Sequence, residues 1–150
     1  MDIREVTELK VAGTVENTGE TPRIVLEDKG AERQVEVLGK VLEAQYRVGD
    51  DFLVLVTEGN PYEEALYIYY FNKHLELLDS LELSAMYGAG VLGNISTANR
   101  NEVCFSFFDS DERWALRVYP APRYTVFGNR HPVKRTFSVF HKSWLSLKKI

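Results

Sequence analysis

The chain has 150 residues, of which 45% are hydrophobic, and a formal net charge of −4 at pH 7. This length and composition support one domain, residues 1–150, with its own hydrophobic core, and they exclude a disordered chain or a disulfide-stapled scaffold. The chain has a single cysteine and no apolar leader after Met1, which predicts a globular protein of the reducing cytoplasm. Its longest near-apolar stretch, residues 65–71, is far shorter than the about 20 residues of a membrane helix, so we expect no membrane partner.

The first third of the chain predicts β-strands. Apolar and polar residues alternate with period two, and turn-forming Asn, Asp and Gly residues separate the runs. In the first run, Leu9, Val11 and Val15 are expected to share one face. The last run is apolar enough to be buried on both faces, so we expect it to form a central pair with the run before it. The predicted strands cover residues 9–15, 24–26, 34–38, 42–48 and 52–56.

The middle of the chain allows two interpretations. An Asn-Pro-x-Glu pattern at residues 60–63 is typical of a helix N-terminus and allows a short helix near residues 61–66. Residues 66–71 are instead rich in strand-forming Tyr, Ile and Phe, and alternation resumes within residues 75–85. We favour a loop followed by a hairpin, with at most that one short helix.

Further short strands complete the pattern in the last third of the chain. Acidic residues at 109–111 and prolines at 120 and 122 predict turns between them. The total reaches roughly 10 to 12 short strands without crossover helices, which predicts a single antiparallel all-β domain arranged as a sandwich, a barrel or propeller-like sheets. These later strands are expected at residues 103–108, 114–119, 124–127, 133–140 and 144–147.

Charge is divided unevenly along the chain. Residues 1–112 contain all 22 acids and 9 Lys and Arg, a net charge of −13, whereas residues 113–150 contain the other 9 basic residues, a net charge of +9. Three explanations fit this division. Opposite charges pair across the sheets, or the basic region binds nucleic acid, or the acidic region binds a basic protein.

One glycine pattern matches a dinucleotide-binding fingerprint. Residues 88–93 read Gly-x-Gly-x-x-Gly, and Asp109 follows at a suitable distance. The next segment, residues 94–101, has no apolar face and cannot supply the helix that such a site needs. We therefore interpret the pattern as a glycine-rich turn or bulge between strands, and we predict no cofactor.

No set of residues indicates catalysis or metal binding. His74, expected in a turn, His131 and His141 lack metal-ligand spacing, and an acid–base pair acting on RNA would need the fold to bring the last two together. Cys104 lies in an apolar run, where we expect a buried side chain of low reactivity. The acids of residues 109–112 are better explained as a solvated turn than as a cation site.

These patterns favour a non-enzymatic protein-binding domain. An acidic β domain suits a stoichiometric inhibitor, such as a bacterial immunity protein that neutralises a basic toxin, for example a nuclease, because charge complementarity speeds association and covers a positive cleft. The candidate contact residues are Asp50, Asp51, Glu63, Glu64, Asp109, Asp111 and Glu112.

Two alternatives remain. The first is a single-stranded nucleic-acid-binding protein that uses the basic, aromatic region 113–150, where alternation places Arg113 and Arg117 on one face of a strand and Trp114 on the other. The second is a small enzyme whose site forms only in three dimensions. Residues expected to contact nucleic acid are Arg113, Arg117, Arg123, Arg130, Lys134 and Arg135.

Overall fold

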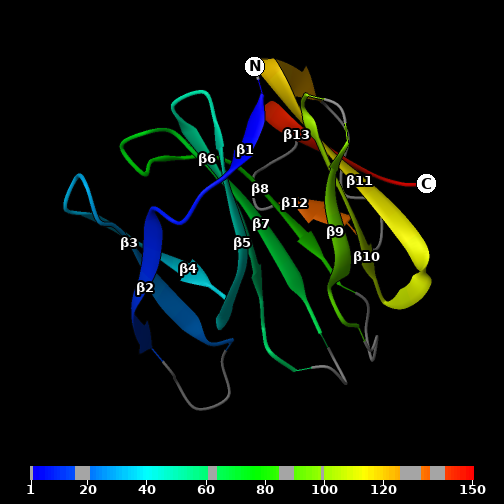
Figure 1. Ribbon diagram of the computed structural model, residues 1–150, viewed down its shortest axis with the longest axis horizontal. Coiled ribbons are helices and arrows are strands. Elements are labelled where there is room, and N and C mark those ends of the chain that lie inside the picture. The colour runs from blue at the N-terminus through cyan, green and yellow to red at the C-terminus, as the bar shows by residue number, and fades with distance from the viewer. Residues whose placement is uncertain are drawn as a thin grey trace.

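The described part of the chain consists of strands, turns and loops, without helix. Figure 1 shows the fold as a computed structural model, which describes residues 2–15, 21–60, 64–84, 90–98, 100–125, 133–135 and 141–150. The all-β prediction is confirmed. The strands are β1 (Ile3–Glu5), β2 (Leu9–Val15), β3 (Arg23–Asp28), β4 (Arg33–Leu38), β5 (Val41–Val48), β6 (Asp51–Thr57), β7 (Leu66–Phe71), β8 (Leu77–Leu83), β9 (Gly93–Ala98), β10 (Glu102–Phe107), β11 (Asp109–Thr125), β12 (Val133–Arg135) and β13 (His141–Lys149).

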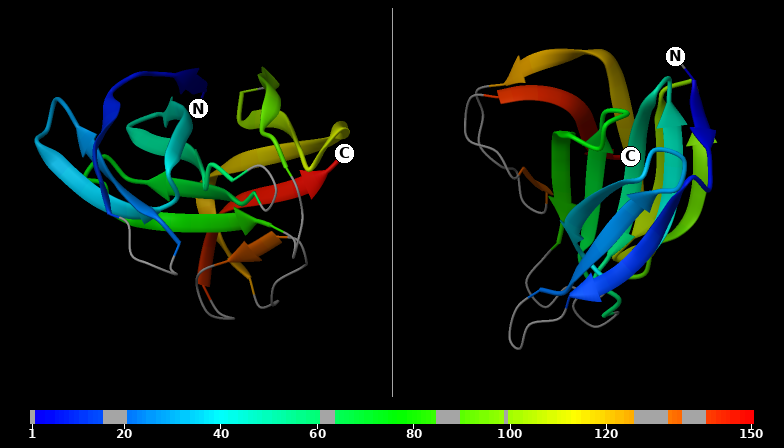
Figure 2. Two further views of the ribbon diagram at one scale, coloured as in Figure 1. Left: turned by 90° about the horizontal axis from the view of Figure 1, so that it is seen from below. Right: turned by 90° about the vertical axis from the view of Figure 1, so that its left-hand side faces the viewer.

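These strands form three antiparallel sheets (Figures 1 and 2). The central sheet has the order β1-β5-β6-β7-β8-β12, the N-terminal sheet has the order β2-β3-β4, and the C-terminal sheet has the order β13-β11-β10-β9. One hydrophobic cluster lies between the central and N-terminal sheets, and another lies between the central and C-terminal sheets. The architecture is therefore a three-layer stack of open sheets with no closed barrel.

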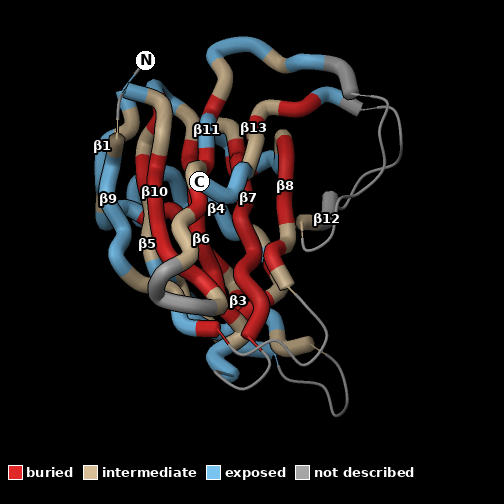
Figure 3. Tube along the Cα trace, turned by 90° about the vertical axis from the view of Figure 1, so that its right-hand side faces the viewer, coloured by how far each residue is buried: buried red, intermediate tan, exposed pale blue. Residues whose placement is uncertain are grey.

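The two faces of β6 belong to different cores. Phe52 and Val54 pack in the cluster that includes Leu26 of β3, whereas Leu53 and Leu55 pack in the cluster that includes strands of the C-terminal sheet. Figure 3 shows the resulting buried strands at the centre of the molecule. The prediction that this strand is buried on both faces, and pairs centrally with β5, is confirmed. It holds because alternate side chains point to opposite sides of a sheet that is covered twice.

The hairpin predicted after the middle loop is confirmed as β7 and β8. Asn72 organises its turn, because its side-chain oxygen accepts hydrogen bonds from the backbone N–H groups of His74 and Glu76 at 2.9 and 3.0 Å. His74 lies in this turn, as expected. Of the short helix considered near residues 61–66, residues 61–63 lie outside the described residues, and Leu66 already begins β7.

Strand β2 forms as predicted, but its expected single face is wrong beyond Val11. A bulge between Val11 and Gly13 shifts the pairing with β3, so that Val11 lies opposite the buried Leu26 while Val15 lies opposite the exposed Arg23. Directly paired residues share a face of a sheet. The bulge therefore moves Val15 to the outer face, a change that simple alternation cannot reveal.

The expected turns at residues 109–111 and 120–122 are also wrong, because both segments lie within the single strand β11. Its pairing with β13 shifts between Val118 and Arg123, and its pairing with β10 extends only as far as Arg117, opposite Glu102. The prolines thus lie where the ladder is interrupted, so their missing N–H groups break no regular pairing. Of the strand expected at residues 133–140, residues 133–135 form β12 and residues 136–140 lie outside the described part.

A buried carboxylate connects the central sheet to the C-terminal sheet. Asp79 of β8 is fully buried, and its Oδ2 atom accepts hydrogen bonds from the backbone N–H groups of Trp144 and Leu145 at 2.9 and 3.0 Å. Its Oδ1 atom accepts a third from the N–H group of Ser80 at 2.8 Å. These bonds hold β13 at the point where its pairing with β11 is interrupted.

Candidate functional site

The acidic residues expected to contact a partner do not all lie at the surface. Glu64 is only 7% exposed, and its carboxylate accepts hydrogen bonds from the backbone N–H groups of Gly59 and Ala65, both at 3.1 Å. Asp51 accepts a hydrogen bond from the Tyr70 hydroxyl at 2.8 Å. Glu64 therefore stabilises the loop before β7. The prediction that its side chain belongs to an exposed acidic surface is wrong.

The remaining acids of the expected set come from separate elements. Asp50 is exposed in the turn between β5 and β6, whereas Glu112 lies in β11 and binds Lys149 of β13 at 2.9 Å. Asp109 and Asp111 belong to the first residues of β11, and Glu63 lies outside the described residues. Asp50 therefore lies in the β5–β6 turn, whereas Asp109, Asp111 and Glu112 lie at the start of β11.

An acidic groove lies elsewhere, between the edge of the central sheet and β9 of the C-terminal sheet. It is open to solvent and has a volume of about 440 Å³, within the range of about 300 to 1,000 Å³ typical of ligand sites. We call this site the β5–β9 groove. It is lined by Glu5, Glu43, Ala44, Tyr46, Ile95, Ser96 and Thr97.

The groove exists because β1 is short. β1 covers the edge of β5 only from Tyr46 to Val48. Beyond it, the Gln45 side chain exchanges two hydrogen bonds of 2.8 Å with the backbone of Leu9 as the chain enters the N-terminal sheet. A bulge between Leu42 and Ala44 then leaves Glu43 as the extra residue at this edge. The edge of β5 on the N-terminal side of Gln45 therefore faces the groove.

The opposite end of the groove is closed by contacts between the two sheets. The backbone N–H group of Ile3 donates a 2.9 Å hydrogen bond to the carbonyl oxygen of Arg100, which follows β9. The Arg100 side chain also forms an exposed ion pair with Asp2 at 3.6 Å. The edges of the central and C-terminal sheets are therefore joined at one end and separate at the groove, which Glu43 and Ser96 both line.

The electrostatic character of the β5–β9 groove is negative. Glu5 and Glu43 are both exposed, and the lining residues include no Lys or Arg. Glu43 accepts a 2.9 Å hydrogen bond from the Thr57 hydroxyl, which fixes one carboxylate oxygen. Burial raises the pKa of Tyr46, and the negative charge of Glu5 raises it further. The groove therefore favours a cationic group placed beside Glu5 and Glu43.

Sequence reasoning missed Glu5 and Glu43. Each lies in an ordinary alternating segment, and the two are far apart along the chain. Only the short β1 strand and the bulge in β5 bring them to the same groove. A local signal for the site was thus absent from the sequence.

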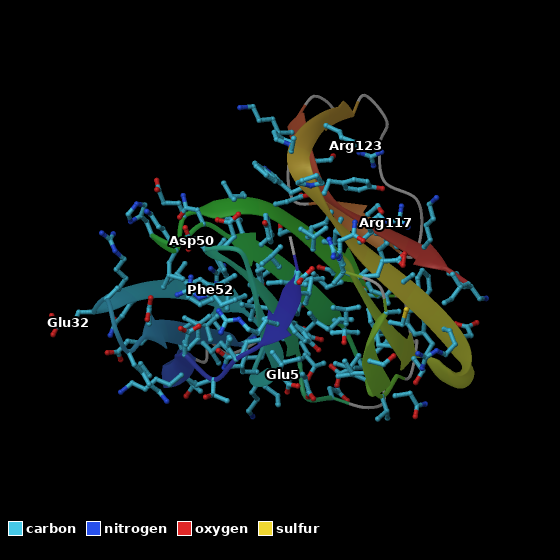
Figure 4. All side chains as sticks on the ribbon, turned by 45° about the horizontal axis from the view of Figure 1, so that its top comes forward. Glu5, Glu32, Asp50, Phe52, Arg117 and Arg123 are labelled. Carbon is cyan, nitrogen blue, oxygen red and sulfur yellow. The ribbon has the colours of Figure 1, made fainter. Side chains whose placement is uncertain are left out.

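The basic residues expected to contact nucleic acid gather in part on the outer face of the C-terminal sheet. Arg117 forms a 2.9 Å ion pair with Glu102, and the Arg123 guanidinium lies 3.8 Å from the centroid of the Tyr119 ring. The hydrogen bond that Arg117 donates to the Glu102 carboxylate raises the pKa of Arg117. Figure 4 shows Arg117 and Arg123 near each other, away from Glu5.

The other basic residues occupy different positions. Arg113 donates a 2.9 Å hydrogen bond to the carbonyl oxygen of Asn94. Lys134 and Arg135 lie in β12 of the central sheet, where Lys134 is paired with Glu82, and Arg130 lies outside the described residues. The alternation expected for β11 is confirmed, since Trp114 is buried and Arg117 is exposed. Ion pairs such as Arg117 with Glu102 also show opposite charges pairing across the sheet.

The residues considered for chemistry are scattered. Cys104 is buried in β10, as expected, whereas His131 and the His141 side chain lie outside what the structure describes. After the glycine pattern, β9 forms in place of a helix, and Gly90 lies against the ring of Phe107, where an added Cβ atom would approach to 3.0 Å. In the described ranges, no three His, Cys, Asp or Glu side chains form a group able to hold a metal ion.

Comparison with known proteins gives no family assignment. The chain matches no family model, no curated protein and no solved structure. Among the described residues, no helix has the length and hydrophobicity of a membrane-spanning segment.

Proposed function

We propose that this protein is a non-enzymatic binding domain for a basic protein, and that it acts in the cytoplasm as a stoichiometric inhibitor of the kind represented by immunity proteins against basic toxins. The observation that carries the proposal is the β5–β9 groove, in which Glu5 and Glu43 face solvent with no Lys or Arg in the lining. Such a site attracts a cationic segment and raises its association rate.

The groove supports binding better than it supports a reaction. Its titratable groups are two exposed carboxylates and the hydroxyl of Tyr46, whose pKa is raised above its ordinary value by burial. Ser96 and Thr97 add hydroxyl groups, which form hydrogen bonds, but no lining residue is a histidine or cysteine that could activate them. Charge and shape are thus the properties that the groove offers to a partner.

Reversing the groove charges should abolish partner capture. We expect the wild-type chain to retain a basic protein at one-to-one stoichiometry from a lysate of the source cells, and the Glu5→Lys/Glu43→Lys variant to bind it at least ~10-fold more weakly, because each cationic contact becomes a repulsion. The purified partner should lose its own activity when one equivalent of the wild-type chain is added. Affinity capture with mass spectrometry, followed by titration of the partner's activity, measures both effects.

The matched control is Glu32→Lys/Glu36→Lys, which makes the same change in net charge on the hairpin of β3 and β4. Glu32 lies at one end of the molecule in Figure 4, whereas Glu5 lies nearer its middle. This control should capture the partner as the wild type does. Equal capture by the groove variant, or recovery of nuclease-sensitive nucleic acid alone, would contradict the proposed function.

A second candidate function is single-stranded nucleic-acid binding, favoured by Arg117, Tyr119 and Arg123 on one outer face. Tyr119 is held in place by a 3.1 Å hydrogen bond between its hydroxyl and Ser146. Guanidinium groups bind phosphates, and an aromatic ring can stack on a base. Here Arg123 already lies over the ring and Glu102 already pairs with Arg117, so a nucleic acid would have to replace existing contacts.

If the second candidate holds, Arg117→Ala/Arg123→Ala should weaken binding of an oligothymidylate about 10-fold at low salt and reduce the dependence of affinity on salt. Fluorescence anisotropy across a salt series measures both quantities. Lys29→Ala/Arg33→Ala removes the same charge from the β3–β4 hairpin and should have a smaller effect. Similar losses of affinity for both variants would show that binding depends only on net charge, and would contradict this candidate function.

A further inference from the structure

The outer edge of β9 is the clearest unpaired edge in the described part of the fold. β9 ends the C-terminal sheet and pairs only with β10, regularly from Ser96 to Ala98. Its residues are mostly exposed, as Figure 3 shows by colour. Beyond this end of the sheet, the backbone N–H group of Ile3 donates a hydrogen bond to the carbonyl oxygen of Arg100. Ile95, Ser96 and Thr97 line the β5–β9 groove, so the groove lies along the unpaired edge of β9.

β9 lacks the charged residues and prolines that protect many edge strands. Natural sheet edges carry charged residues or prolines, which prevent pairing with another chain. The β9 sequence, Gly-Asn-Ile-Ser-Thr-Ala, has neither. Every other edge strand among the described residues carries charge: β1 has Arg4, β2 has Lys10, β4 has Arg33, β12 has Lys134 and β13 has Lys142.

An added strand would lie in the β5–β9 groove. Paired strands lie about 4.8 Å apart, so a strand that pairs with the outer edge of β9 occupies the space between β9 and β5. On one side it meets β9, and on the other it meets β5 at the bulge that contains Glu43. Glu5 and Glu43 would then lie beside alternate side chains of the added strand.

We propose that an extended, basic segment of a partner protein binds by adding as a strand to the edge of β9, with Lys or Arg side chains beside Glu5 and Glu43. In this mode, main-chain hydrogen bonds supply affinity and alternate side chains supply specificity. The inference rests on the proposed function, which names the same groove and the same charge of partner, and it adds the backbone pairing.

The test uses the full chain and a blocked seven-residue peptide of alternating Lys and Val. We expect this peptide to bind, and N-methylation of alternate amides on one of its two edges to weaken binding at least ~10-fold, since the methyl groups remove the hydrogen bonds to β9 and leave the charge unchanged. Two peptides, methylated at odd or even positions, cover both orientations. A peptide with Glu in place of Lys should not bind.

Amide hydrogen exchange locates the contact. With the unmethylated peptide, exchange of the β9 amides should slow, whereas the edge strand β4 of the N-terminal sheet should be unchanged. Fluorescence anisotropy gives the affinities, and sedimentation gives the oligomeric state of the chain.

The outcomes separate the two proposals. If both methylated peptides bind as well as the parent while Glu5→Lys/Glu43→Lys abolishes binding, strand addition is overturned and the proposed function stands. If that variant binds the parent peptide as the wild type does, charge recognition in the groove is overturned as well. Absence of binding by any peptide up to about 1 mM overturns the inference, as does a dimer in which β9 is already protected by a second copy.

Discussion

Replacing Asp79 by Asn should destabilise the protein by about 3 kcal/mol, because a buried hydrogen-bond donor left unsatisfied costs about 1 to 3 kcal/mol. Backbone N–H groups of Ser80, Trp144 and Leu145 donate hydrogen bonds to this carboxylate. An amide has only one acceptor oxygen. In either orientation its NH₂ group therefore faces at least one backbone N–H group. Urea unfolding followed by tryptophan fluorescence measures the loss.

Asp50→Asn is the matched control for this prediction. It makes the same chemical change at an exposed turn and should alter stability by no more than about 0.5 kcal/mol. Equal effects of the two substitutions would show that the hydrogen bonds donated to Asp79 by β13 contribute little to stability. In the Asp79 variant, amide exchange of β13 should also speed up more than that of β6, because the lost bonds hold β13.

Leu26→Ala should cost about 2 to 5 kcal/mol, the range for removing a large aliphatic side chain from a packed core. Leu26 is fully buried in the cluster between the N-terminal and central sheets, together with Phe52 and Val54. The N-terminal sheet, which contains Leu26, packs against one face of β6, and the other face of β6 belongs to the second core. We therefore expect one cooperative unfolding transition at a lower urea concentration, with fluorescence and circular dichroism changing together.

Val11→Ala is the control, because Val11 lies directly opposite Leu26 in the adjacent strand but is 41% exposed. Its substitution should cost less than about 1 kcal/mol. If instead Leu26→Ala produced an early transition of the N-terminal sheet alone, that sheet would be an independent unit and not a layer of a common core.

The sequence predicted much of the secondary structure, because alternation reports which strands have a buried face. The run at 52–56 was apolar on both faces, and β6 is indeed covered on both. The errors arose at bulges. In β2 the shift after Val11 reverses the exposed face, and in β11 an interrupted ladder accommodates Pro120 and Pro122 within a strand.

The candidate site was harder to predict than the fold. Glu64 belonged to an acidic pair in the sequence, yet its carboxylate is buried against backbone N–H groups. Glu5 and Glu43 had no distinguishing pattern. Their proximity depends on the length of β1 and the bulge in β5, which are properties of pairing between distant segments.

By itself, the sequence determined the all-β class, the doubly buried strand at 52–56 and the uneven distribution of charge. These properties depend on residue type and on periodicity along the chain, so local patterns express them. Only the tertiary structure decided the three-layer stacking, the anchoring of β13 by Asp79 and the acidic groove beside the open edge of β9. Each of these depends on which strands become neighbours, and long-range pairing is fixed by the packing of the whole chain.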